Sequence, residues 1–126
     1  MKQLFLSLAL LAGIFAATLW NTARVTEIST TIADTLDQAE AAAVQGDWQK
    51  ASTLTQQAQA HWERCNLYFS VVLRHGDTDD VATTFQEAQG FLLWKDEAEY
   101  TSVNRVLTEK VRHLSRMEAL SWRNLL

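Results

Sequence analysis

Apolar and polar residues recur with a helical period along most of the chain, and the first segment is the exception. Leu4 to Trp20 holds seventeen residues without a charge. A helix that spans a bilayer needs roughly 17–25 apolar residues, whereas the apolar core of a secretory signal has about 7–15. The length therefore favours a membrane helix. A cleaved signal peptide is the alternative, and a buried soluble helix is a more remote one.

The residues around this segment favour an anchor that is retained. Ala16 and Thr18 are the best pair of small residues for signal cleavage, and they are not the usual alanine pair. Trp20 ends the segment, and tryptophan prefers the interface between membrane and water.

Charge sets the expected orientation of the anchor. Lys2 and the terminal amine favour a cytoplasmic N-terminus, and only Arg24 opposes them. We therefore predict a single-pass protein of the cell membrane, with a transmembrane anchor at residues 1–21 and an extracytoplasmic helical domain at residues 22–126.

The domain begins with an amphipathic stripe. Nothing in the sequence breaks a helix after Trp20, so one helix should run from the membrane to Gln45, where Gly46 can cap it and Asp47 can start the next. Apolar residues of this stripe follow at spacings of three and four: Val25, Ile28, Ile32, Leu36, Ala39 and Ala43.

A second helix, from Asp47 to His75, has a heptad pattern. One seam position holds Trp48, Thr55, Trp62 and Phe69, and the position three residues on holds Ala51, Ala58, Cys65 and Val72. His61 and His75 lie on the flank of this seam. The predicted core residues of the helix are Trp48, Trp62, Cys65 and Phe69.

Two further helices complete the pattern. Gly76 should end the second helix, and Asp77 to Asp80 should cap the third and oppose its dipole. The third should give way near Lys95, where Asp96 and Glu99 are spaced as in a capping box. The inward positions are Val81, Phe85, Ala88 and Leu92 in the third helix, and Tyr100, Val103, Leu107, Val111, Leu114 and Met117 in a fourth that ends near Trp122.

The two glycine corners also resemble each other. "GDWQKASTLTQQAQ" from Gly46 and "GDTDDVATTFQEAQ" from Gly76 share residues at matching places. The spacing of thirty residues does not match the tetratricopeptide period, so we interpret the similarity as reused turn chemistry.

The composition fixes the fold class. The 126 residues include no proline and only four glycines, which removes the residues that tight hairpins need. We predict an all-α fold in which the membrane helix continues into an antiparallel up-down bundle of about four helices. The net charge is -4 and the basic residues are scattered singly, which excludes DNA and RNA as partners.

Candidate chemistry is sparse. His61 and Cys65 have a ligand-like spacing of four residues, with His75 and His113 elsewhere, but no metal motif accompanies them, and we expect no metal or other cofactor. No nucleophile elbow or phosphate loop is present, so we do not expect an enzyme.

The helix ends hold the candidate interaction residues. Helix lengths at about 1.5 Å per residue bring the corner at His75 and the C-terminal "SWRNLL" to the membrane-facing end. Trp122, Arg123, Asn124 and His75 are therefore the predicted contacts with lipid or a partner. Closure of the bundle by the terminal leucines is the alternative.

Several short stretches together resemble a known family. They are the leading membrane segment, "DWQKA", "HWERCNLYFSVVLRHGDTDDV" and "VRHLSRMEALSWRNLL". The chain resembles the family called domain of unknown function 4363 (DUF4363), small proteins of Gram-positive bacteria. The resemblance implies a single-pass helical protein of uncharacterised activity, with Trp62, His75 and Asn124 at positions that match the family's pattern.

These observations favour a membrane-anchored accessory or interaction domain that partners a membrane protein. The alternative is a small-ligand or metal sensor that uses the interior of the bundle.

Overall fold

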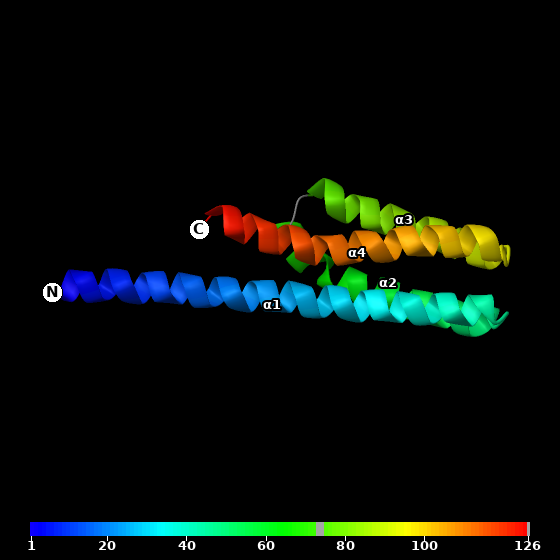
Figure 1. Cartoon of the computed structure of the whole chain (residues 1–126), viewed down its shortest axis with the longest axis horizontal. Helices are drawn as coiled ribbons and strands as arrows, with labels where there is room; N and C mark the ends of the chain where they lie inside the picture. Colours follow the sequence, from blue (N-terminus) through cyan, green and yellow to red (C-terminus); the bar gives the residue numbers. More distant parts are fainter. Residues whose placement is uncertain (73–74, 126) are drawn as a thin grey trace.

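Figure 1 shows the computed structural model of the chain. It describes the backbone of residues 1–72 and 75–125, and the side chains of these residues apart from 22, 67–72, 75–77, 115 and 117–125. Helices are the only regular secondary structure among the described residues. They are α1 (Lys2–Val44), α2 (Trp48–Val72), α3 (His75–Leu93) and α4 (Glu97–Leu125).

The predicted all-α bundle is confirmed. Successive helices run in opposite directions, and each packs on two others: α1 on α2 and α4, and α3 on α2 and α4. The N-terminal part of α1 extends alone beyond the other three helices (Figure 1). As predicted, α1 runs without a break from the apolar segment into the bundle.

Two turns of the same construction close one end of the bundle. At the end of α1, the amide of Gly46 donates to the carbonyl of Ala43 at 3.0 Å, and the amide of Asp47 donates to the carbonyl of Ala42 at 2.9 Å. Gly46 has a φ of 81°, which glycine adopts at no steric cost. This is a Schellman motif, and it confirms the predicted cap at Gly46.

The turn between α3 and α4 repeats this bonding with a lysine in place of glycine. The amide of Lys95 donates to Leu92 and that of Asp96 to Phe91, each at 3.1 Å, and Lys95 has a φ of 52°. Asp47 and Asp96 then cap the following helices, since their Oδ1 atoms accept the amides of residues 50 and 99 at 3.2 Å.

The predicted corner at Gly76 was wrong. α2 ends at Val72 and α3 begins at His75, so Gly76 lies inside the first turn of α3 and does not end α2. This start of α3 places the exposed carboxylates of Asp79 and Asp80 in its first turns, near the positive end of its dipole. The structural counterpart of the Gly46 turn is therefore the one at Lys95.

The core follows the predicted stripes. All six predicted positions of the first helix are buried, as are all four of the third, and in α4 the stripe is buried at Tyr100, Leu107, Val111 and Leu114. Trp62 is 2% exposed and is the largest fully enclosed side chain among those described. Trp48, Cys65 and Val103 are partly buried and pack against the core, while the side chains of Phe69 and Met117 lie outside the described set.

Candidate functional site

The uncovered half of α1 is the most conspicuous surface of the molecule. Its large apolar side chains are exposed from residue 1 to residue 20, and the first fully buried residue of the helix is Val25. At 1.5 Å per residue, residues 2–21 span about 30 Å, the thickness of the hydrocarbon core of a bilayer. Within the described chain, α1 is the one helix long and apolar enough to cross a membrane, and a signal sequence at this position would have the same features.

A tryptophan and an arginine lie where this surface meets the bundle. The guanidinium carbon of Arg24 is 6.0 Å from the centre of the Trp20 ring, within range of a cation–π contact. Both residue types are typical of the interface between lipid and water. The pair lies at the boundary between the uncovered and the buried halves of α1.

The four predicted interaction residues lie at the end of the bundle that faces the apolar half of α1. His75 is the first residue of α3, and Trp122, Arg123 and Asn124 lie in the last turn of α4. Figure 1 shows the start of α3 and the end of α4 on this side, opposite the turns at Gly46 and Lys95. The side chains of all four residues lie outside the described set, so the structure places their backbone alone.

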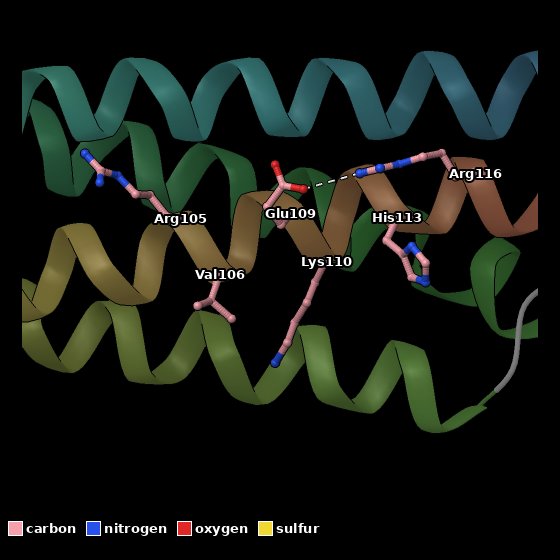
Figure 2. Close-up of a pocket in the computed structure, with 6 residues that line it drawn as sticks. All are labelled: Arg105, Val106, Glu109, Lys110, His113 and Arg116. Carbon is pink, nitrogen blue, oxygen red and sulfur yellow. Dashed lines mark hydrogen bonds and ion pairs between the residues drawn. The ribbon is translucent and has the colours of Figure 1, made fainter.

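A shallow groove of about 520 Å³ follows the outer face of α4 between α1 and α3 (Figure 2). Four basic side chains line it, together with one valine and one glutamate. The lining residues are Arg105, Val106, Glu109, Lys110, His113 and Arg116.

The two arginines and the lysine of this groove each form an ion pair with a carboxylate of the chain. Arg105 Nε lies 2.7 Å from Glu40 Oε1 of α1, and Lys110 Nζ lies 3.1 Å from Asp80 Oδ2 of α3. Arg116 lies 3.3 Å from Glu109 on its own helix. Because each cation has an acidic partner inside the chain, the groove offers an external anion little net attraction.

Arg112, also on α4, lies near three carboxylates, those of Asp34, Asp37 and Glu109. Its Nη2 lies 2.6 Å from Asp37 Oδ2 and 4.0 Å from Asp34 Oδ1, both on α1. The hydrogen bond to Asp37 is the main reason that the pKa of Arg112 is raised. Exposed pairs of this kind contribute about 0–1 kcal/mol each, so they orient α4 between its neighbours more than they stabilise it.

The histidine and cysteine of α2 are separate from this groove. His61 is partly buried, and its pKa is lowered by burial and then by the charge of Arg64. Cys65 was predicted to be buried and is only partly so. Among the described side chains, no three His, Cys, Asp or Glu residues lie close enough together to hold a metal ion.

A layer of buried polar side chains crosses the bundle and consists of Thr55, Tyr100 and Asn104. The sequence analysis placed Thr55 and Tyr100 on inward stripes and missed Asn104. Thr55 Oγ1 donates to the Ala51 carbonyl at 2.8 Å, so the Tyr100 hydroxyl, 2.7 Å away, is the donor to Thr55. Burial raises the pKa of Tyr100 and outweighs the bond to Thr55, and the charge of Glu40 raises it further. This bond connects α4 with α2, two helices that face each other diagonally.

Asn104 continues the layer one turn along α4. It is fully buried, and its Nδ2 donates to the Leu36 carbonyl of α1 at 2.9 Å, while its Oδ1 has no partner. The sequence could have indicated that Asn104 is buried, because it lies four residues after Tyr100 and three before Leu107 on the inward stripe. The layer therefore fixes the rotation of α4 against α1 and α2.

A model of one known protein family matches most of the chain. No curated protein and no solved structure matches the chain. The family model described as "Domain of unknown function (DUF4363)" matches residues 19–125, which is the bundle with the last two residues of the apolar run. The chain therefore belongs to the DUF4363 family.

Proposed function

We propose that this chain is a single-pass membrane protein whose helical bundle serves as an accessory domain for a partner in the same membrane. It acts through contacts and not through catalysis. One observation carries the proposal: the two halves of α1 have opposite surroundings. Residues 25–43 supply one side of the core, whereas the large apolar side chains of residues 4–20 are exposed.

Exposure of such a surface to water is costly. Large exposed apolar surfaces are rare on soluble proteins and indicate contact with a membrane or another protein. A run of about 30 Å without a charged residue matches the hydrocarbon core in both length and polarity. The charge at Lys2 supports a cytoplasmic N-terminus and an extracytoplasmic bundle.

The continuity of α1 supports a stiff connection between anchor and bundle. No proline interrupts its 43 residues, and helices kink sharply mainly at proline, at glycine–serine pairs or at bulges. An upright bundle then turns the end of α4 towards the bilayer. On this proposal, Trp122, Arg123, Asn124 and His75 contact lipid or the membrane partner.

Membrane extraction and intact mass test the anchor together. In the native host, the protein should stay with the membrane pellet after washing with alkaline carbonate, and its mass should include residues 4–20. A soluble form that begins near Leu19 or Asn21 would show that the segment is a cleaved signal, and the proposal would be wrong.

Site-specific crosslinking tests the partner. A photoreactive residue in place of Asn124 should crosslink to lipid or to an integral membrane protein. The same group in place of Glu87, an exposed residue on α3, is the matched control and should give no such product. Equal crosslinking at both positions would show that the end of α4 has no special role.

A further inference from the structure

The end of the bundle opposite the anchor carries a second apolar surface. We call residues 44–50 and 93–99, which form the turns at Gly46 and Lys95 with their flanking helical turns, the distal tip. Figure 1 shows both turns at the same end of the bundle. Leu93 and Trp94 are each 84% exposed, and Val44 is 56% exposed.

These exposures set the tip apart from the rest of the bundle. Outside the apolar half of α1, large exposed apolar side chains among those described are found at these three positions and at Val106. A tryptophan is seldom so uncovered, and exposed aromatic residues are enriched where proteins bind one another. Trp94 belongs neither to the buried core nor to the partly buried residues packed against it.

A hollow lies next to this apolar surface. It measures about 160 Å³ and lies between α2 and α3, with Leu92 and Leu93 on one side. Ser52, Gln56 and Gln89 complete its lining, so it contains no charged group. Such a lining suits an apolar side chain flanked by backbone polar groups.

Acidic residues surround the apolar surface. The tip holds four carboxylates, Asp47, Asp96, Glu97 and Glu99, against the two amines of Lys50 and Lys95. All four carboxylate residues are exposed, and the ion pairs found among the described side chains involve other residues. Two helix starts and two helix ends meet here, so their dipoles largely offset one another and the net charge remains negative.

We propose that the distal tip is a docking surface for an apolar protein segment that carries lysine or arginine beside its apolar side chains. Leu93 and Trp94 supply the apolar contact, and the carboxylates favour the basic residues of the partner. A second copy of this chain is disfavoured, because two acidic tips would repel each other. An anionic lipid surface is disfavoured for the same reason.

This surface adds to the proposed function and does not depend on the anchor. The chain remains intact in the test, reconstituted in nanodiscs, and is used to select binders from a random peptide library displayed on phage. The selected peptides should be enriched in aromatic or aliphatic residues together with lysine and arginine. Selection of acidic peptides, or no enrichment over empty nanodiscs, would overturn the proposal.

Variants of the tip then locate the binding. The affinity of the best selected peptide, measured by fluorescence anisotropy, should fall about tenfold or more in Trp94→Ala. It should fall several-fold in the double variant Glu97→Gln with Glu99→Gln, which should also weaken the dependence on salt. Val106→Ala is the matched control, because it removes an exposed apolar side chain of α4 outside the distal tip. The affinity of this variant for the peptide should equal that of the wild type.

Two further results would overturn the proposal. One is unchanged affinity in Trp94→Ala while its melting temperature equals that of the wild type, because the peptide would then bind elsewhere. The other is a dimer of the wild type, seen by sedimentation in detergent, that Trp94→Ala dissociates. That result would make a second copy the occupant of the tip.

Discussion

Replacing Lys95 by glycine should stabilise the fold. Lys95 is the one residue other than glycine with a positive φ among those described, at 52°. The left-handed conformation costs a residue with a side chain about 1–2 kcal/mol, because its Cβ approaches a carbonyl oxygen. Gly46 occupies the equivalent position of the other turn without that cost.

The size of the gain follows from two opposing terms. Glycine removes the steric cost, but it loses about 0.5–1 kcal/mol more conformational freedom on folding than other residues do. The net stabilisation in Lys95→Gly should be about 0.5–1 kcal/mol. For a domain of about a hundred residues this corresponds to a rise in melting temperature of about 2–5 °C.

Thermal unfolding of the full chain in detergent, followed by far-ultraviolet circular dichroism, measures this change. Gly46→Ala is the mirror control. A Cβ added there meets no atom within 4 Å, so its expected loss of about 1 kcal/mol comes from the backbone alone. Lys95→Ala should be nearly neutral, because it keeps the strain and removes an exposed side chain. An unchanged or lower melting temperature in Lys95→Gly, with Lys95→Ala neutral, would refute the reasoning.

Three further changes test the core. Trp62→Ala removes the largest enclosed side chain and should cost about 3–5 kcal/mol in denaturant unfolding, and a loss below about 1 kcal/mol would contradict its core position. Asn104→Leu removes an amide whose Oδ1 has no partner and should raise the unfolding free energy by about 1 kcal/mol, whereas a clear loss would mean that the bond to Leu36 dominates. Because burial raises the pKa of Tyr100, the stabilisation from its protonated phenol is present below about pH 10 and is lost as the pH rises through the folded pKa. Tyr100→Phe should therefore lose less stability than the wild type above pH 10, and parallel losses in denaturant unfolding at each pH would contradict this.

The helical periods predicted most of the fold because they depend on local spacing. The stripe that begins at Val25 and the cap at Gly46 are confirmed, since an amphipathic helix followed by glycine has few alternatives. The corner at Gly76 was placed wrongly for the same local reason. A glycine before an aspartate resembles the turn at Gly46, while Lys95, which does adopt the left-handed conformation, carries no sequence signal for it.

The ion pairs between helices could not be predicted from the sequence. The pairs of Arg112 with Asp37 and of Arg105 with Glu40 join residues far apart in the chain, and their pairing depends on how α4 is rotated against α1. Exposure of a tryptophan at a helix end is observed at Trp94, which directly follows α3. For Trp122 it stays a prediction, because that side chain lies outside the described residues.

Depth-dependent quenching tests the upright, anchored bundle most directly. A fluorophore is attached to a cysteine at residue 126 or at Gly46, in a Cys65→Ser background, and the protein is reconstituted in bilayers that contain lipid-borne quenchers. The account predicts quenching at residue 126 and none at Gly46, on the distal tip. Equal quenching at both sites, or quenching at Gly46 alone, would contradict it.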